Sequence, residues 1–380
     1  MCSTIAALAL ITAVHATGDV PGNAANAAIL MHMDSGKVLY EKNADEHLLI
    51  ASTTKIMTAL VTIENASLSE QVIATRENCS VEGSSVYLRP GAAYTVEMLL
   101  YGMMLSSGND AALALAEHVS GSEEAFVNLM NDYAAELGLR NTHFANPHGL
   151  DADDHYSSAA DLAKLTCEAM KNETFAQIVS ARDYGFDSRV LVNHNKLLWR
   201  VDGCGGVKTG YTKAAGRCLV SFAERDGLRL ICVTLSDPQD WTDHEALLTW
   251  GFQNWQYRKP FPEGFVAAVP VISGEAETAR VSCAQGIKVL VSTECKIAAR
   301  LELPPFVYAD VKAGAHAGYL YLYADDEELA REELVFAESV AKAKNMHLTA
   351  LEQIRRGFEH SGRYGGVWQY GIVYAPASVN

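Results

Sequence analysis

The 380-residue chain has too little positive charge and too few metal-ligand patterns for several common functions. It holds 30 Lys and Arg against 46 Asp and Glu, a formal net charge of -16. Nucleic-acid binding needs clustered Lys and Arg to meet phosphates, so this balance argues against a general nucleic-acid binder. Eight cysteines occur, but none forms a Cys-x-x-Cys pair and no His spacing suits zinc. We therefore expect no metal, no other cofactor and no nucleic-acid partner.

Apolar runs long enough to cross a bilayer are also missing. The first run, residues 5–14, is short and ends at Val14-His15-Ala16, which is typical of a small-residue cleavage site. We interpret residues 1–16 as a signal peptide, which predicts an exported protein. No Lys or Arg precedes the run, so a buried N-terminal helix remains the alternative.

What is present is a globular composition, with 49% hydrophobic and 20% charged residues. Alternating residues with a turn at residues 34–36 predict a first hairpin, and two strand-like runs joined by a turn at residues 225–227 predict another. Apolar residues recur at helical intervals between them. Strands, then helices, then strands predict an α/β (α+β) fold, an antiparallel sheet with a helical insertion. The predicted helices cover residues 52–64, 95–105, 122–137 and 243–255, with a further one opened by the capping box at Ser158.

The pattern changes after residues 259–264, where two prolines and a glycine predict a linker. Residues 24–258 are therefore expected to form the larger domain, and residues 265–340, a series of short β-like stretches, a small β-rich domain. The tail, residues 341–380, has apolar residues at helical spacing that could form an amphipathic helix. It has no long apolar span, so membrane association stays open.

The string Ser52-Thr53-Thr54-Lys55 begins a predicted helix, so Ser52 and Lys55 share one face, one turn apart. A serine hydroxyl is a weak nucleophile until a base removes its proton, and a lysine partly desolvated among apolar residues can be neutral enough to do so. Backbone N–H groups at the helix start favour developing negative charge. Alone, the motif is not specific, because a capping serine beside a solvated lysine gives the same string.

Ser107-Gly108-Asn109 lies between two predicted helices and therefore in a loop that presents polar groups. A second hydroxyl beside Lys55 could relay a proton to a departing amine. The Asn109 amide could hold both the lysine and the substrate backbone. For this triplet alone, an ordinary turn with a helix cap is the alternative.

The string Lys208-Thr209-Gly210-Tyr211-Thr212 precedes a predicted strand pair, and its glycine leaves the backbone uncrowded. Lysine and threonine side chains on a strand edge can bind a terminal carboxylate. The N–H of Tyr211 could pair with that of Ser52 as an oxyanion hole. An exposed basic turn is the alternative for this string alone.

Together and in this order, the three motifs resemble the penicillin-recognising serine enzymes, whose signatures are Ser-x-x-Lys, Ser-x-Asn and Lys-Thr-Gly. Longer strings narrow the likeness to the low-molecular-mass penicillin-binding proteins that are D-alanyl-D-alanine carboxypeptidases: Asn146-Pro147-His148-Gly149-Leu150, His155-Tyr156-Ser157, Asn193-His194-Asn195-Lys196-Leu197-Leu198 and Gly206-Val207-Lys208-Thr209-Gly210-Tyr211-Thr212. The likeness covers about residues 28–256 and continues, more weakly, beyond. It implies a β-lactamase/transpeptidase-like fold with a small C-terminal all-β domain.

The resemblance also implies an activity. Ser52 would form an acyl-enzyme with the penultimate D-alanine of peptidoglycan stem peptides ending in D-Ala-D-Ala, with Lys55 as its base. Ser107 would pass the proton to the leaving D-alanine. β-Lactams would be covalent inhibitors that acylate Ser52, and the protein would act at the cell wall or the outer face of the cytoplasmic membrane. The implied substrate-binding residues are Asn109, Lys208, Thr209, Gly210 and Tyr211, whereas His148 and His155 are expected to be structural.

Two other functions remain open. A class A β-lactamase shares the motifs but needs a Glu that primes water, and the nearest string, Glu124-Ala125-Phe126-Val127-Asn128, lies in a predicted amphipathic helix. Gly108 also stands where those enzymes commonly have Asp. The other alternative is a non-catalytic peptidoglycan-binding module, against which the complete set of reactive residues argues.

Overall fold

The computed structural model describes residues 19–261, 264–283, 286–324, 327–344, 352, 355 and 373–374. They divide into two units, one of residues 19–253 and one of the described residues from 254 onward. The predicted signal peptide lies outside the described residues, as does most of the predicted tail helix. Within the described part of the chain, no helix is both long enough and apolar enough to cross a membrane.

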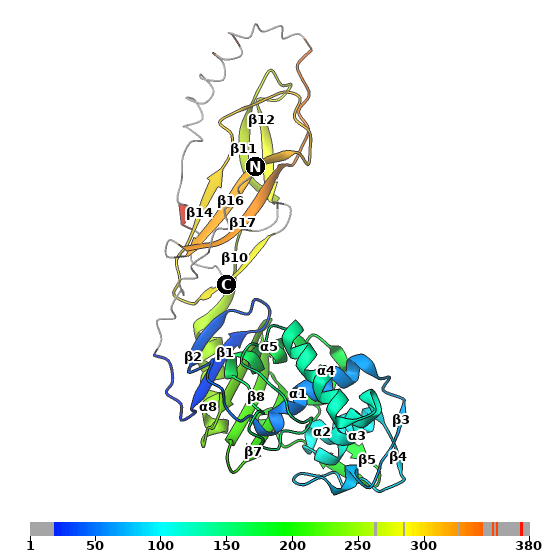
Figure 1. Cartoon of the computed structure of the whole chain (residues 1–380). Helices are drawn as coiled ribbons and strands as arrows, with labels where there is room; N and C mark the ends of the chain where they lie inside the picture. The colour runs from blue at the N-terminus through cyan, green and yellow to red at the C-terminus, as the bar shows by residue number, and fades with distance from the viewer. Residues whose placement is uncertain are drawn as a thin grey trace, which may run out of the picture. The chain divides into compact units, whose positions relative to one another are not determined.

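The first unit is built on one sheet whose two edges come from opposite ends of the unit. Its strands are β1 (Ala27–His32), β2 (Val38–Lys42), β7 (Cys204–Thr212), β8 (Gly216–Arg225) and β9 (Leu228–Leu235). They are antiparallel neighbours in the order β2-β1-β9-β8-β7. The chain leaves the sheet after β2 and returns at β7, so the predicted hairpins and the predicted helical insertion are confirmed (Figure 1).

Between β2 and β7 lie helices and two small hairpins, and one helix follows the sheet. Their caps follow the sequence signals: the side chains of Thr95, Ser122 and Ser158 accept N–H groups at the starts of three helices. The helical segments are η1 (Ala51–Thr54), α1 (Lys55–Asn65), η2 (Asn78–Ser80), α2 (Val96–Leu105), α3 (Asn109–Ser120), α4 (Glu123–Glu136), α5 (Ala159–Ala169), α6 (Glu173–Ser180), α7 (Leu197–Arg200) and α8 (Asp240–Asn254), and the hairpins are β3 (Gln71–Ile73) with β4 (Ala93–Thr95) and β5 (Asp183–Phe186) with β6 (Arg189–Val192).

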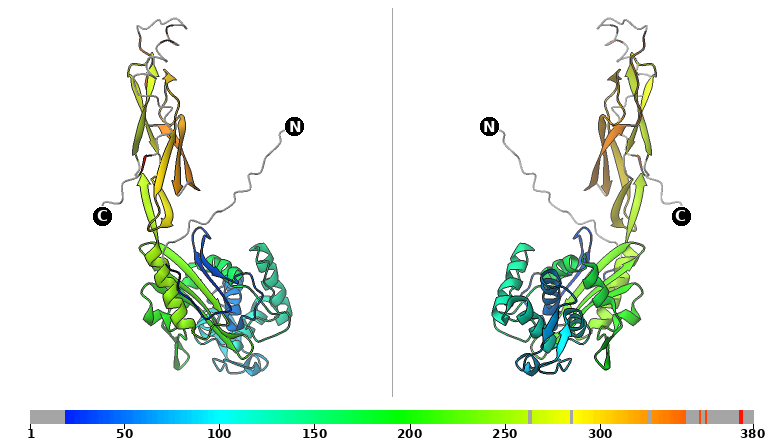
Figure 2. Two further views of the ribbon diagram at one scale, coloured as in Figure 1. Left: turned by 90° about the vertical axis from the view of Figure 1, so that its left-hand side faces the viewer. Right: turned by 90° about the vertical axis from the view of Figure 1, so that its right-hand side faces the viewer.

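Alternate residues of a strand point to opposite faces of the sheet, and both faces of this sheet are covered by helices. Ile29 and Ile231 belong to the core shared with the helical insertion. Leu30 and Leu230 point the other way, against α8, where a Cβ on Gly251 would lie 2.7–2.8 Å from their methyl groups. Figure 2 shows α8 on one side of the sheet and the helical block on the other.

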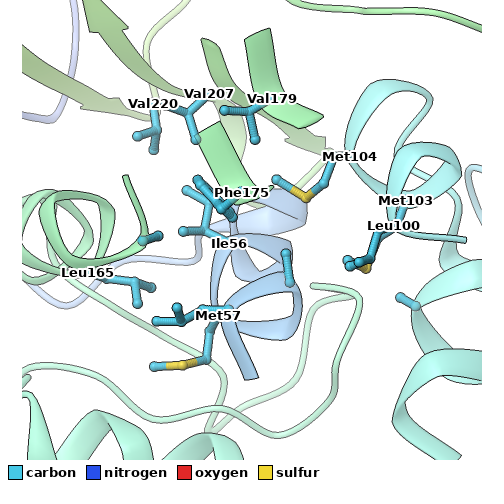
Figure 3. Packing of buried hydrophobic residues seen from close by; sticks show 14 of the residues in the cluster. Ile56, Met57, Leu100, Met103, Met104, Leu165, Phe175, Val179, Val207 and Val220 are labelled. Carbon is cyan, nitrogen blue, oxygen red and sulfur yellow. The ribbon is translucent and has the colours of Figure 1, made fainter. Parts of the chain in front are cut away.

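Helix α1 is buried on all sides over its first two turns, as expected for a helix at the centre of a domain. Residues 55–62 are all buried. Figure 3 shows Ile56 and Met57 of α1 among side chains that include Leu165 and Phe175. The first residue of this helix is Lys55, so the packing that stabilises the domain also fixes the position of a lysine.

The second unit folds as β-strands and their connections over its described residues between 255 and 344, which confirms the predicted C-terminal β-domain fold. Residues with buried side chains, such as Leu320 and Leu322, alternate with half-buried ones along its strands. The strands are β10 (Trp255–Phe261), β11 (Gly264–Ile272), β12 (Thr278–Cys283), β13 (Ile287–Ser292), β14 (Ile297–Glu302), β15 (Val307–Tyr308), β16 (His316–Ala324), β17 (Glu327–Phe336) and β18 (Val373–Tyr374). Seven of them form one sheet, β15-β11-β12-β17-β16-β14-β18, and β10 pairs with β13.

The expected linker at residues 259–264 is partly strand. Lys259 and Pro260 belong to β10, at the point where its register with β13 shifts between Arg258 and Phe261. A proline is tolerated there, because its missing N–H interrupts no regular ladder.

The turn between β9 and α8 buries a carboxylate. Asp237 is fully buried, and its Oδ1 accepts the Gln239 N–H at 2.9 Å. Burial raises the pKa of Asp237 to about 6, and the negative charge of Asp243 adds to the rise. At neutral pH this carboxylate is therefore charged at a cost to folding.

Replacing Asp237→Asn keeps the acceptor for Gln239 and removes the charge. The raised pKa means that the folded state holds an extra proton between about pH 4 and pH 6, so the stability of the natural protein falls as pH rises through this window. We expect the Tm of the variant, relative to the natural protein, to be a few degrees higher at about pH 7.5 than at about pH 4.5. Calorimetry at both pH values measures this, and an equal Tm difference at the two would contradict it.

Candidate active site

Ser52 lies on the 3-10 turn η1, not in the α-helix that was predicted to begin at this residue. The turn starts with Ala51 in the left-handed region, at φ 46°. It leads directly into α1, whose first residue is Lys55, and the Lys55 Nζ lies 2.9 Å from the Ser52 Oγ. The tighter turn keeps the serine and the lysine together while leaving Ser52 half-buried at the surface of the core.

The Lys55 amine has two further acceptors, the Oδ1 of Asn109 at 2.8 Å and the backbone carbonyl of His148. Burial holds the pKa of Lys55 well below its usual range, and the positive charge of Lys208 lowers it further, while Asp110 opposes the shift. A neutral amine has two hydrogens and one lone pair. In that neutral form, with its two hydrogens donated to Asn109 and the His148 carbonyl, the lone pair would face the Ser52 hydroxyl.

The His148 carbonyl is presented by a tightly held turn over residues 146–150. The Asn146 side chain closes the turn, accepting the Gly149 N–H at 2.7 Å and donating to the Leu150 carbonyl at 2.9 Å. Sequence reasoning missed this acceptor, because any residue type supplies a backbone carbonyl. Burial is the main cause that lowers the pKa of the His148 imidazole to about 3, so the ring is neutral near neutral pH.

His155 supports the turn η1, which carries Ser52. Its Nδ1 accepts the Ala145 N–H at 3.0 Å, so its Nε2 carries the hydrogen and donates to the Thr54 hydroxyl at 2.7 Å. The Thr54 hydroxyl in turn donates to the Ala51 carbonyl at 2.8 Å. These contacts fit a structural role for His155.

Ser107 and Asn109 lie where α2 ends and α3 begins. Ser107 has a left-handed backbone, at φ 61°, a conformation that costs a non-glycine residue about 1–3 kcal/mol and that clusters at functional sites. Its Oγ accepts a hydrogen bond from the Lys208 Nζ at 3.2 Å. Burial lowers the pKa of Lys208 to about 7.

Strand β7, at the edge of the sheet, places Lys208, Thr209 and Gly210 beside Ser52 and Ser107. The backbone of Gly210 approaches η1 so closely that a Cβ there would lie 3.1 Å from both the Ile50 carbonyl oxygen and the Ser52 nitrogen. Thr209 is half-buried, and Tyr211 is 66% exposed. The three motifs therefore lie together. Lys55 forms hydrogen bonds with Ser52 and Asn109, and Lys208 forms one with Ser107.

A segment that the sequence analysis did not single out, residues 82–88, is tied to the same site. Asp110, fully buried, accepts hydrogen bonds from the Ser85 hydroxyl at 2.6 Å and from the N–H groups of Val86 and Leu88 at 3.0 Å each. The Asn109 amide donates to the Glu82 carbonyl at 2.6 Å. The carboxylate next to the Ser-x-Asn motif was the available signal, because a buried carboxylate needs several donors.

Metal ligands are not grouped anywhere in the described ranges, where no three His, Cys, Asp or Glu side chains could hold an ion together. The polar groups at the site are a hydroxyl pair, two buried amines and an amide. Such a set can transfer an acyl group to a serine and from there to water.

A glycine pair tests how far the site depends on the turn at residues 146–150. Gly149 has φ 87°, and a Cβ there would lie 2.0 Å from the Ala51 carbonyl oxygen, whereas Gly138, at φ 67°, has open space. We expect Gly138→Ala to lower the free energy of unfolding by about 1 kcal/mol, the cost of a left-handed alanine. Gly149→Ala should lose at least twice as much, because the Ala51 turn must also move. Urea unfolding measures both, and equal losses would mean that the turn adapts freely.

Known proteins are similar to this chain in sequence and in fold. Residues 14–239 match the family model for D-alanyl-D-alanine carboxypeptidase, and residues 255–342 match that for the penicillin-binding protein 5 C-terminal domain. The chain is 35% identical over 336 residues to the D-alanyl-D-alanine carboxypeptidase DacF of Bacillus subtilis, an alignment that covers 84% of this chain and 86% of the relative. It is 33% identical over 380 residues to DacC of Escherichia coli, covering 94% and 90%.

Among solved structures, penicillin binding protein 5 from Haemophilus influenzae superimposes with a TM-score of 0.68 at 29% identity, covering 85% of this chain and 99% of that one. Penicillin binding protein 6B from Escherichia coli also gives 0.68, at 27% identity, covering 83% and 96%. The transpeptidase-like fold with a C-terminal β-domain is thus confirmed over both units. From its motifs, its fold and its relatives, the chain belongs to the D-alanyl-D-alanine carboxypeptidase family of penicillin-binding proteins.

Proposed function

We propose that this protein is a serine-type D-Ala-D-Ala carboxypeptidase that removes the terminal D-alanine from peptidoglycan stem peptides through an acyl-enzyme on Ser52. The observation that carries the proposal is the buried Lys55 amine, 2.9 Å from the Ser52 Oγ, with its other two acceptors already in place. Because its pKa is held low, it can take the serine proton without first being deprotonated by solvent.

In the first step, Ser52 attacks the carbonyl of the penultimate D-alanine while Lys55 takes the hydroxyl proton. The N–H groups of Ser52 and Tyr211 stabilise the oxyanion that forms, since Gly210 brings β7 against the nucleophile's turn. The Asn109 amide holds the peptide backbone of the substrate.

The leaving D-alanine needs a proton on its nitrogen and a partner for its carboxylate. Ser107 accepts a hydrogen bond from Lys208, so its own hydroxyl hydrogen is directed to the leaving nitrogen and is replenished from Lys55. Lys208 and the Thr209 hydroxyl bind the carboxylate. Water then hydrolyses the ester on Ser52.

The same chemistry predicts inhibition by β-lactams, whose ring carbonyl would acylate Ser52. We further propose that the protein is exported, with residues 1–16 as its signal peptide, because stem peptides of the wall lie outside the cytoplasm. A β-lactamase is less well supported: the nearest candidate for its water-activating carboxylate, Glu124, is an exposed residue of helix α4.

Covalent labelling tests the nucleophile. Fluorescent penicillin should modify Ser52, located by mass spectrometry of the labelled peptide, and a peptide ending in Lys-D-Ala-D-Ala should lose one D-alanine. Ser52→Ala should abolish both. Ser122→Ala is the matched control, since Ser122 also begins a helix and its loss removes only a cap, about 1 kcal/mol.

Two outcomes would replace this proposal. Binding of the peptide without any release would make the protein a peptidoglycan-binding module. Rapid turnover of penicillin, in place of a long-lived adduct, would make it a β-lactamase.

The pH dependence tests the carboxylate site. Lys208 must be protonated to attract the substrate carboxylate, and burial lowers its pKa to about 7. We expect kcat/KM to fall as pH rises through about 7, since this constant reports the free enzyme. Lys208→Arg should move the fall to higher pH, because arginine stays protonated to about pH 12. A pH profile of D-alanine release measures the shift, and an unmoved descending limb in the arginine variant would assign the pKa to another group.

A further inference from the structure

A carboxylate that takes no part in the proposed chemistry is held against the edge strand near the active site. Asp151 is exposed, and its Oδ1 accepts a hydrogen bond from the Thr212 hydroxyl at 2.8 Å. The Thr212 Oγ1 also accepts the Ala215 N–H at 2.9 Å, so this hydroxyl belongs to the turn between β7 and β8. Asp151 is thereby fixed beside the last residue of β7.

The loop that carries Asp151 also supports the catalytic groups. The His148 carbonyl accepts a hydrogen bond from the Lys55 amine. A Cβ on Gly149 would lie 2.0 Å from the Ala51 carbonyl oxygen, in the turn that carries the nucleophile. Asp151 follows Gly149 by two residues, which span at most about 7 Å. It therefore lies close both to η1 and to the end of β7.

The direction of the bound peptide follows from the proposed contacts along β7. The terminal carboxylate of the substrate meets Lys208 and Thr209, and the carbonyl that is attacked meets the Tyr211 N–H. The peptide chain therefore runs from its C-terminus towards its N-terminus as β7 runs from Lys208 to Thr212, like an added antiparallel strand. Strand β7 can receive such a strand because it is an edge of its sheet.

The residue before the penultimate D-alanine is the next one to be placed. Each residue of an extended chain advances by about 3.4 Å, so this residue lies beyond Tyr211, towards Thr212 and the carboxylate bonded to it. In wall stem peptides this position holds a diamino acid, whose side chain ends in an amine. Such an amine, when protonated, is the natural partner of the Asp151 carboxylate.

The two ends of the bound peptide thus meet opposite charges. Lys208 lies at the end that takes the terminal carboxylate, and Asp151 lies at the other end. Glu82 adds a second exposed carboxylate on the acyl side, where its backbone carbonyl accepts the Asn109 amide at 2.6 Å. Lys213, exposed in the turn after β7, offsets part of this negative charge. A stem peptide with a free side-chain amine has the matching order of charges.

We propose that Asp151 is a specificity-determining residue that binds the side-chain ammonium of the diamino acid preceding D-Ala-D-Ala. This inference rests on the proposed function and deepens it. In a stem peptide whose amine has been used for a cross-link, that amine has become an uncharged amide. The enzyme therefore prefers stem peptides whose side-chain amine has not yet been acylated by a cross-linking reaction.

A series of substrates that differ in one charge tests this. Each is Nα-acetyl-L-Lys-D-Ala-D-Ala, with its side-chain amine free, acetylated or succinylated, and therefore positive, neutral or negative. At an ionic strength of about 0.01 M, we expect kcat/KM for D-alanine release to be about threefold higher for the free amine than for the acetylated one, as for an exposed ion pair. The succinylated substrate should be the poorest of the three.

Salt and the separate kinetic constants distinguish an ion pair from a change of shape. At about 1 M salt, which screens exposed charges, the ratio of the free to the acetylated substrate should approach one. The preference should appear in KM and not in kcat, because the ammonium keeps its contact throughout the reaction.

Two isosteric variants assign the preference to one carboxylate. Asp151→Asn keeps an oxygen that can accept from Thr212 and removes the charge, so the ratio at low salt should fall close to one. Asp153→Asn is the matched control, since Asp153 is exposed two residues further along and its replacement removes the same charge. Its ratio should equal that of the natural protein. Both constants come from one protein sample, so poor folding of a variant cancels in the ratio.

The outcomes separate the inference from the proposed function. Equal kcat/KM for all three substrates overturns the inference and leaves the carboxypeptidase intact. A preference that Asp151→Asn retains, or that Asp153→Asn removes to the same extent, also overturns it. Release of D-alanine from none of the three substrates rejects the proposed function, and the inference with it.

Discussion

The site depends on one buried amine held between fixed acceptors. Lys55 is fully buried at the start of α1, and its nitrogen lies within hydrogen-bond distance of Ser52, Asn109 and the His148 carbonyl. Burying a charged ammonium group is unfavourable, so burial shifts the protonation equilibrium of Lys55 towards the neutral amine. Because two acceptors take the two hydrogens of the neutral amine, geometry alone decides where its lone pair points.

This arrangement requires parts of the chain that are far apart to be held rigidly. The first two turns of helix α1 are packed on every side, which fixes the backbone from which the Lys55 side chain extends. The turn at residues 146–150 fits against η1 only because Gly149 has no side chain, and the lack of a side chain on Gly210 lets β7 approach η1 closely. Core packing and close backbone approach thus position the reacting groups, and the polar contacts within the site add orientation.

Much of this was predictable from the sequence. The helix starts at Thr95, Ser122 and Ser158 follow from their capping side chains, and the hairpins follow from alternation and turn residues. The order of the three motifs pointed to one pocket. What sequence could not supply were contacts made by backbone atoms, such as the His148 carbonyl, since they depend on conformation and not on residue type.

Two lysines in one small site can perform different tasks only if their protonation differs. Both lysines are buried, and two positive charges close together repel each other. A state in which only one of the two amines is protonated is therefore preferred over a state in which both are. Burial lowers the pKa of both lysines, but only the pKa of Lys55 is lowered further by the charge of its neighbour. Once Lys55 is neutral, the positive charge of Lys208 no longer repels it. The negative charge of Asp110 opposes the lowering of the Lys55 pKa, but the Asp110 oxygens accept hydrogen bonds from the segment at residues 82–88. Position and charge therefore favour Lys55, beside the serine, as the proposed base and Lys208, on the strand edge, as the proposed cation, whose protonated form a substrate carboxylate would favour.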